Sequence, residues 1–271
     1  MQLSTLEKIA NEIKFKIILN SSKTGTPHLG SCLSCSDILV VLYYSILNID
    51  INNPGDKLRD RFILSKGHGA AALFQILASK GFFDLSLMDS YGEDGTLLAE
   101  HPPAPDYLPG IEAATGSLGH GLPIGLGMAM AAKINNFDYH VYALLGDGEC
   151  NEGSIWEAAN MAAAQKISNL TVIVDSNKWQ ATDRSSDLVG STTLVEKWKA
   201  FGWNTLEIDG HNLSEISIAL KTKADSQPTA IIANTVKGSG VSFMEDDNNW
   251  HYRIPTNEEV ELAFKELGMK K

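Results

Sequence analysis

Apolar and polar positions along the chain alternate between two periods. Short apolar runs bounded by glycine or polar turns predict strands at residues 61–65, 141–145, 170–175, 203–208 and 229–235. Apolar residues spaced three or four positions apart predict helices at residues 1–22, 37–47, 70–80, 122–133, 155–162, 193–201, 214–223 and 257–267. Strands that alternate with helices, without a hairpin signal, indicate a mostly parallel sheet with helices on both faces. We therefore predict an α/β fold and, since no repeat or linker interrupts the pattern, a single domain over residues 1–271.

The connections between these elements include three long loops rich in glycine or proline, at residues 21–31, 92–116 and 236–255. Loops as long as 92–116 are usually either functional or disordered. The helix at 122–133 consists largely of glycine, alanine and methionine, so another backbone can approach it closely. We expect a buried helix there, with a subunit contact as the more specific alternative.

Composition narrows the class of protein. Of the 271 residues 44% are hydrophobic and 20% charged, and the formal net charge is −11. That charge argues against a nucleic-acid surface or an anionic membrane as the main partner, although a bound metal ion would still allow a phosphorylated ligand. Three cysteines, an amphipathic rather than secretory start, and an apolar stretch at 119–132 that is too short to span a bilayer predict a cytoplasmic protein.

Candidate metal chemistry begins where the strand 141–145 runs into Gly146, Asp147 and Gly148 and then into a helix. Glycines there allow a ligand to approach the backbone, and the start of the helix offers free N–H groups to an anion. An acid beside a phosphate makes sense if a divalent cation lies between them. Gly-Asp-Gly is also an ordinary turn sequence. The stronger signal is Asn177, which follows the next strand, because a right-handed βαβ unit places it beside Asp147.

Five of the seven histidines lie in loops beside glycine, proline or a turn: His28, His68, His101, His120 and His251. One such histidine is more often a loop cap or a surface residue than a catalytic group. Several of them on the strand-end loops of one sheet favour a shared site, because imidazole forms hydrogen bonds and moves protons near neutral pH.

The segments GDGECNEGSIWEAANMAA and DSNKWQATD, which carry Asp147 and Asn177, resemble the metal and diphosphate motif of thiamine diphosphate enzymes, and of transketolases in particular. Other stretches are similar to transketolase motifs: HLGSCLS at 28–34, SKGH at 65–68, HP at 101–102, GSLG at 116–119, KGSG at 237–240 and WH at 250–251. The resemblance therefore covers almost the whole chain. One departure is Pro27, which precedes His28 where the family has proline after the histidine.

The resemblance implies a thiamine diphosphate-binding fold and a set of site residues. It implies that Asp147, Asn177 and the backbone carbonyl of Trp179 ligate Mg²⁺ or Ca²⁺. It implies cofactor contacts from His68, Gly116, Leu118, Gly146, Asp147, Gly148, Asn177 and Lys237. It assigns catalytic roles to His28, His101 and His251, which would face the sugar, and to His68 near the diphosphate. Glu152 is also assigned a catalytic role, in a carboxylate network across a subunit interface.

The similarity to a full-length transketolase covers only its first, diphosphate-binding domain. We therefore expect the N-terminal subunit of a two-chain transketolase, with a companion pyrimidine-binding subunit in an α2β2 assembly. The implied reaction transfers a two-carbon ketol unit from a ketose or its phosphate to an aldose or its phosphate. The alternatives are a different thiamine diphosphate reaction, such as 2-oxo acid decarboxylation with acyl transfer to an unusual sugar, and a non-catalytic regulatory relative. A dinucleotide-binding protein is disfavoured because no G-x-G-x-x-G opens a helix after the first strand.

Overall fold

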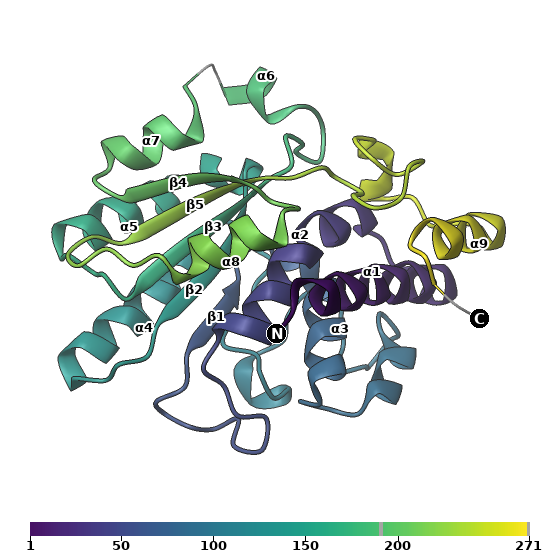
Figure 1. The fold of residues 1–271 in the computed structure, drawn as a ribbon, viewed down its shortest axis with the longest axis horizontal. Coiled ribbons are helices and arrows are strands. Elements are labelled where there is room, and N and C mark those ends of the chain that lie inside the picture. Colours follow the sequence, from purple (N-terminus) through teal and green to yellow (C-terminus); the bar gives the residue numbers. More distant parts are fainter. Residues whose placement is uncertain (190–191, 270–271) are drawn as a thin grey trace.

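A parallel sheet forms the centre of the computed structural model, which describes residues 1–189 and 192–269. Within those residues the sheet has five strands in the order β1-β2-β3-β5-β4, every neighbouring pair parallel (Figure 1). The strands are β1 (Arg61–Leu64), β2 (Val141–Gly146), β3 (Leu170–Ser176), β4 (Asn204–Asp209) and β5 (Thr229–Asn234). The predicted α/β fold with a mostly parallel sheet is confirmed, and each predicted strand is present within a residue or two of its expected bounds.

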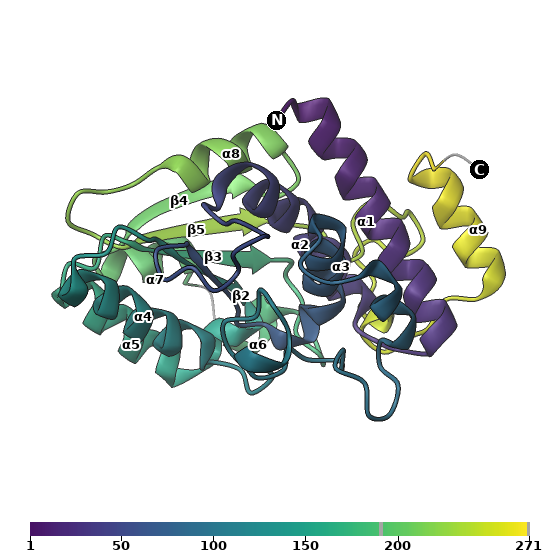
Figure 2. The same cartoon turned by 90° about the horizontal axis from the view of Figure 1, so that it is seen from below.

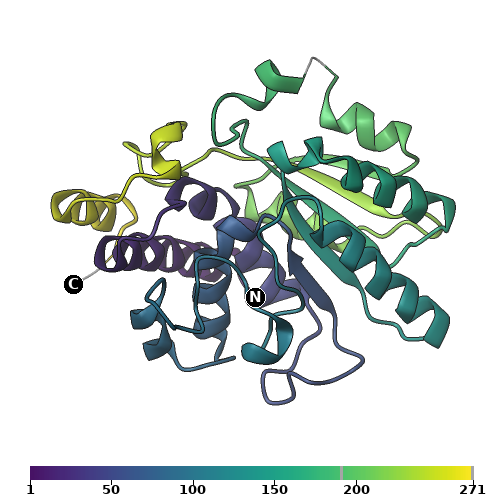
Figure 3. The ribbon, with the colours of Figure 1, turned by 180° about the vertical axis from the view of Figure 1, so that it is seen from behind.

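Helices cover both faces of the sheet. The α-helices are α1 (Leu3–Thr24), α2 (Leu29–Val41), α3 (Ala70–Lys80), α4 (Gly121–Asn135), α5 (Gly153–Ala164), α6 (Ser185–Val189), α7 (Leu194–Ala200), α8 (Leu213–Lys221) and α9 (Asn257–Glu266). Seen from below, α1 and α8 lie on one side of the sheet and α4 and α5 on the other (Figure 2). From behind, α4 and α5 run next to each other across the sheet (Figure 3).

Strand side chains divide between the two faces because successive residues of a strand point in opposite directions. In β2, Leu144 joins the core under α1, α2, α3 and α8, while Leu145 joins the core under α4, α5 and α7. Similarly in β3, Ile173 belongs to the first core and Val174 to the second. Both faces of the sheet are therefore buried at its central strands, which explains why β2 and β3 are mostly apolar without an alternating pattern, whereas the edge strand β4 is only partly buried.

The second helix differs from its predicted bounds. It begins at Leu29 rather than at residue 37, and a π-helical turn, Leu42–Ile46, continues it. The Gly- and Ser-rich start resembled a loop, but burial overrides that preference, and hydroxyls such as Ser36 Oγ bond back to helix carbonyls, here Cys32 O at 2.8 Å. The stretch Leu29–Ile46 is long and apolar enough to cross a membrane, yet 83% of it is buried in the protein, as befits a core helix.

Helix α4 lies unusually close to the sheet. A Cβ on Gly121 would lie 2.4 Å from the Cβ of Ser65, and one on Gly125 would lie 3.4 Å from Ile63 Cδ1. The small residues predicted to permit a close approach thus bring α4 against the end of β1. This contact draws the loop before α4 to the carboxyl edge of the sheet, where the polar motifs also gather.

Candidate functional site

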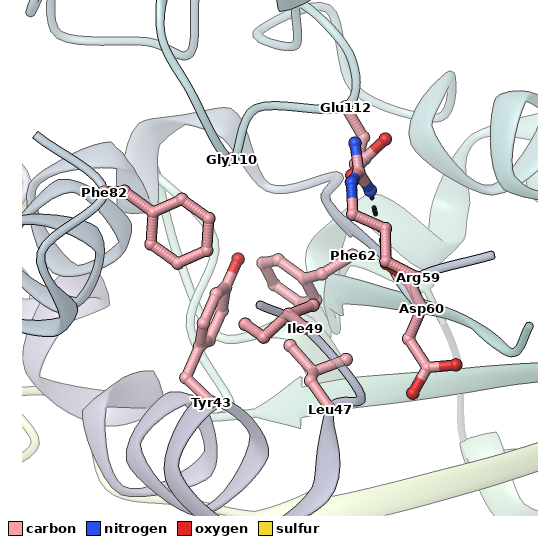
Figure 4. Close-up of a pocket in the computed structure, with 9 residues that line it drawn as sticks. All are labelled: Tyr43, Leu47, Ile49, Arg59, Asp60, Phe62, Phe82, Gly110 and Glu112. Carbon is pink, nitrogen blue, oxygen red and sulfur yellow. Dashed lines mark hydrogen bonds and ion pairs between the residues drawn. The ribbon is translucent and has the colours of Figure 1, made fainter. Parts of the chain in front are cut away.

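A cavity of about 420 Å³ opens at the carboxyl ends of β1, β2 and β3. Eleven of the site residues predicted from sequence line it: His68, Gly116, Leu118, Gly146, Asp147, Gly148, Glu152, Asn177, Trp179, Lys237 and His251. Another cavity, between Tyr43 and Glu112 near the amino end of β1, has a volume of only about 10 Å³, room for about one water molecule (Figure 4). The cavity of about 420 Å³ is the candidate site because it brings the predicted site residues together.

Four of the loop histidines form one cluster. The ring centroid of His28 lies 5.0 Å from that of His251, 5.8 Å from that of His68 and 5.9 Å from that of His101. His28 joins the cluster although Pro27 precedes it. The backbone of His28 adopts a positive φ of 73°, and the His28 N–H donates to the His251 carbonyl at 2.8 Å. The fifth, His120, is exposed at the start of α4 and does not line the cavity.

Three of the clustered histidines, His28, His68 and His251, are neutral at physiological pH. Burial, followed by His101 and Lys237, lowers the pKa of His28 to about 4. Burial and Lys237 lower the pKa of His251 to about 3, and burial with Lys66 lowers that of His68 well below its ordinary value. Neutral imidazoles both donate and accept hydrogen bonds, so the cluster suits the hydroxyl and carbonyl oxygens of a polar ligand.

Asp147 and Asn177 stand side by side at the edge of the sheet, because Gly146 is in register with Asp175. Asp147 Oδ2 accepts a hydrogen bond from Ser185 Oγ at 2.8 Å, and Asn177 Oδ1 accepts one from the Trp179 N–H at 3.1 Å. Burial, with the neighbouring Asp175 adding to it, raises the pKa of Asp147 to about 6. A divalent cation would offset the cost of the buried carboxylate, and the oxygen donors here suit Mg²⁺ or Ca²⁺.

Two buried lysines make the same edge electropositive. Lys66 forms an ion pair with Asp175, and Lys237 Nζ donates to Asn248 Oδ1 at 2.6 Å. Although burial opposes the charge on Lys66, Asp175 raises its pKa overall. Burial and the neighbouring Lys66 lower the pKa of Lys237 to about 8. The charged form of Lys237 is thus disfavoured in the folded chain. An anion in the cavity would stabilise that charged form, because an opposite charge nearby favours it.

The loop after Asn177 is joined to the loop after Lys237 by three side chains, which we call the clasp: Trp179, Arg184 and Asp246. The Arg184 guanidinium lies 3.7 Å from the Trp179 ring centroid and donates two hydrogen bonds of 2.6 Å to the Asp246 carboxylate. Trp179 Nε1 donates to Asp246 Oδ1 at 2.9 Å. The clasp thus fixes the backbone at Trp179, whose carbonyl was predicted to ligate a metal ion.

The residues around the cavity fit a diphosphate with a divalent cation. Gln180 Nε2 is buried and has no hydrogen-bond partner within residues 1–189 and 192–269, although the amide lies at the cavity wall. Gln180 packs over Gly148 so closely that a Cβ on Gly148 would lie 2.8 Å from Gln180 Cγ. A free amide donor and two lysines are groups that a phosphate can bind.

Sequence reasoning missed four polar residues of this edge: Lys66, Glu149, Asp175 and Gln180. Lys66 lies inside the SKGH motif, and Asp175 is the one acid in an otherwise apolar or neutral strand, so both carried a signal. Glu149 and Gln180 carried none, since each lies in a polar loop and acquires its role from its tertiary neighbours.

Comparison with known proteins shows the family of this chain. The family described as "Transketolase, thiamine diphosphate binding domain" matches residues 5–271. The chain belongs to the transketolase family. The cofactor of this transketolase domain is thiamine diphosphate, and a divalent metal ion is standard in the family.

Some relatives are similar to this chain over nearly the full length of both proteins. The chain is 39% identical to an apulose-4-phosphate transketolase subunit of Phocaeicola vulgatus, over 99% of this chain and 95% of that one. It is 39% identical to the 6-deoxy-6-sulfo-D-fructose transketolase subunit SqwG of a Clostridium species, over 97% and 96% of the two chains. Its homologues are thus thiamine diphosphate-dependent transferases, and these relatives of its own length are single subunits of split transketolases.

Single-chain transketolases are similar only in part. The human transketolase is 36% identical over the entire chain, which spans 44% of the human protein. The crystal structure of the Campylobacter jejuni transketolase superposes with a TM-score of 0.92 at 31% identity, over 99% of this chain and 43% of that one. The chain therefore spans less than half the length of the single-chain transketolases that it matches.

Proposed function

We propose that this chain is the N-terminal subunit of a two-chain transketolase, which moves a two-carbon ketol unit from a ketose or its phosphate to an aldose or its phosphate. The observation that carries the proposal is the cavity that Asp147, Asn177 and Lys237 line together with His68 and His251, beside which His28 and His101 complete the histidine cluster. Similarity to single transketolase subunits over nearly their full length supports a companion chain.

The proposed cofactor contacts follow from the cavity wall. Asp147, Asn177 and the carbonyl of Trp179 would hold Mg²⁺ or Ca²⁺, with Gly146 at the turn before them. Gly148, His68 and Lys237 would bind the diphosphate, while Gly116 and Leu118 would line the thiazolium side. When bound, thiamine diphosphate supplies a stabilised carbanion that allows a carbon–carbon bond of a ketose to break.

The chain itself would bind the sugar and move its protons. His28, His101 and His251 would face sugar oxygens, to which imidazole rings form hydrogen bonds. The buried His28 Nδ1 lacks a hydrogen-bond partner among the described residues, which supports a ligand contact there. A pKa of about 4 keeps His28 unprotonated at pH 7, so it is able to accept a proton from a hydroxyl.

The assembly completes the proposal. We infer that residues 1–271 act as one thiamine diphosphate-binding domain in an α2β2 enzyme, with sugar phosphates as substrates and the cytoplasm as its compartment. Three free, buried cysteines agree with a reducing compartment. Glu152, exposed at the cavity wall, is available for a carboxylate network with another subunit. The retained acid, amide and histidines argue against a non-catalytic regulatory role.

Calorimetric titration of thiamine diphosphate with Mg²⁺ tests the proposal, first into the chain alone and then into its complex with a companion subunit. We expect binding in the complex that Asp147→Ala abolishes. Asp138→Ala, which changes an exposed acid at the amino end of β2, is the matched control and should bind normally. Absence of binding in a complex whose formation is verified by gel filtration would refute the proposal. Ketol transfer between sugar phosphates, measured with the same complex, then tests the reaction.

A further inference from the structure

The carboxylate of Glu149 is buried just behind the turn that carries Asp147. The residue as a whole is 2% exposed. Its Oε1 accepts hydrogen bonds from Ser65 Oγ and, at 3.0 Å, from the Gly119 N–H. Its Oε2 accepts one from the Gly146 N–H at 3.2 Å. Each oxygen is therefore occupied by donors of the chain itself.

These three donors belong to three separate segments of the cofactor cavity. Ser65 directly follows β1 and precedes Lys66 and His68, while Gly119 closes the loop that carries Gly116 and Leu118. Gly146 ends β2 directly before Asp147. A single side chain thus connects the diphosphate, thiazolium and metal parts of the proposed site, which are far apart in sequence.

Further contacts make the connection rigid. Ser65 Oγ accepts a hydrogen bond from the Gly121 N–H at 3.1 Å, so its own hydrogen is left to point to Glu149. Gly119 is also held at its carbonyl, which accepts from Ser154 Oγ at 2.8 Å. A Cβ on Gly119 would lie 2.7 Å from Glu152 Cβ, so this loop has little room to move.

The chemistry of the connection requires a carboxylate. Ionised glutamate only accepts hydrogen bonds, and here it meets three donors, whereas glutamine would present an N–H₂ group to one of them. No lysine or arginine forms a salt bridge with Glu149 among the described residues, so hydrogen bonds from backbone and hydroxyl groups compensate its charge directly, and Lys66 acts only at longer range. The interaction is therefore sensitive to the geometry of all three segments.

We propose that Glu149 is a positioning residue, which holds the loop before His68, the loop before α4 and the metal turn in the arrangement that thiamine diphosphate requires. This inference rests on the proposed function, because it takes the cavity to be the cofactor site. It assigns no contact with cofactor or substrate to Glu149, which acts through the three segments that it joins.

The experiment compares Glu149→Gln with wild type in the complex with the companion subunit. We expect the Kd for thiamine diphosphate at saturating Mg²⁺ to rise roughly tenfold, as fits the loss of hydrogen bonds to a charged group, while kcat at saturating cofactor changes less than about twofold. In the chain alone, amide hydrogen exchange at Gly119 and Gly146 should accelerate. Ser65→Ala should raise the Kd by about threefold in wild type but hardly further in Glu149→Gln, because both changes remove the same connection.

Glu112→Gln is the matched control, since Glu112 is a largely buried carboxylate beside Arg59 and Arg61 near the amino end of β1 (Figure 4). It should lower the unfolding temperature without changing the cofactor Kd. An unchanged Kd in Glu149→Gln would overturn the inference. If Glu149→Gln does not fold, an unchanged Kd in Ser65→Ala would overturn it instead. Failure of the wild-type complex to bind thiamine diphosphate would instead refute the proposed function. That outcome differs from an unchanged Kd in the variant, so the two failures can be told apart.

Discussion

Lys66 and Asp175 form an ion pair in which neither side chain is exposed to solvent. The pair connects the loop after β1 to the end of β3, and Asp175 also accepts hydrogen bonds from Ser34 and Thr235. Asn177 Nδ2 lies 3.4 Å from the same Asp175 carboxylate, which turns the Asn177 oxygen away from it. The pair therefore orients a proposed metal ligand as well as joining two strands.

Removing one partner of this ion pair should be costly. Lys66→Met leaves the Asp175 carboxylate buried without its cation, so we expect a loss of about 3–5 kcal/mol in the free energy of unfolding. Lys66→Met with Asp175→Leu removes both charges and should recover most of that loss. Urea unfolding of the chain alone measures both effects. Equal losses in the single and double variants would show that packing rather than charge sets the stability here.

Lys237 should reveal a conflict between stability and binding. Since burial and Lys66 lower its pKa to about 8, its charged form is disfavoured in the folded chain. Lys237→Met should therefore stabilise the chain alone at pH 7 by up to about 3 kcal/mol, because it removes a penalised cation. This gain in stability should disappear as the pH rises from about 8 toward 10.5. Wild-type Lys237 loses its proton near pH 8 in the folded chain and near pH 10.5 in the unfolded chain, so the penalty is gone above both values.

The same substitution should weaken diphosphate binding in the complex by at least about tenfold, because a charged donor to the phosphate is lost. Calorimetry with thiamine diphosphate measures the change. Lys133→Met is the control. Lys133 is exposed in the last turn of α4, and its Nζ donates to the Gln165 carbonyl. Loss of both stability and binding in Lys237→Met would contradict the predicted opposition.

The histidine cluster should make stability depend on pH. His28 and His251 have pKa values of about 4 and 3 in the folded chain, against an ordinary value of 6.5. Below pH 6.5 the unfolded chain takes up protons that the folded cluster excludes. Stability is thus complete above pH 6.5 and falls by up to about 1.4 kcal/mol per pH unit for each histidine as the pH drops toward 4.

Urea unfolding at about pH 7.5, 6 and 5 measures this slope. His251→Asn should flatten it, while His120→Asn, at an exposed position outside the cluster, should not. Part of the slope should remain in His251→Asn, because burial also lowers the pKa of His140 to about 3. The same slope in wild type and His251→Asn would show that the cluster does not exclude protons.

The clasp should contribute more to Mg²⁺ affinity than to the stability of the fold. Arg184 and Asp246 are partly exposed, and exposed ion pairs add little to stability, so Arg184→Ala should barely change the unfolding midpoint. It should nevertheless weaken Mg²⁺ binding in the complex by several-fold, because the Trp179 carbonyl loses its support. Arg253→Ala is the control, as Arg253 similarly pairs with Glu259 and stacks over Trp250. Equal effects of both substitutions on Mg²⁺ would argue against a specific role for the clasp.

The sequence was sufficient to predict the sheet because buried parallel strands leave uninterrupted apolar runs between turns. It failed at the start of α2, where Gly30 and Ser31 favour a loop locally but are buried by tertiary packing. Helix α6 was not predicted, since five residues are too few to show a periodic pattern.

The candidate site was predictable wherever a residue belongs to a local motif, as Asp147, His68 and Lys237 do. It was not predictable where a role depends on partners distant in sequence. Glu149 acts through Ser65, 84 positions away, and Lys66 through Asp175, 109 positions away. Burial also changes the chemistry of these groups, and no local pattern reports how deeply a loop is covered.

The clasp has an optical consequence. Trp179 is held between a guanidinium and a carboxylate at the edge of the cavity, whereas Trp198, Trp203 and Trp250 are buried in the protein. Indole fluorescence responds to nearby charges, so Trp179 emission would change when the two loops separate, against the background of these three buried rings and of the half-buried Trp156. The chain thus carries a built-in spectroscopic reporter at the place where its proposed cofactor enters.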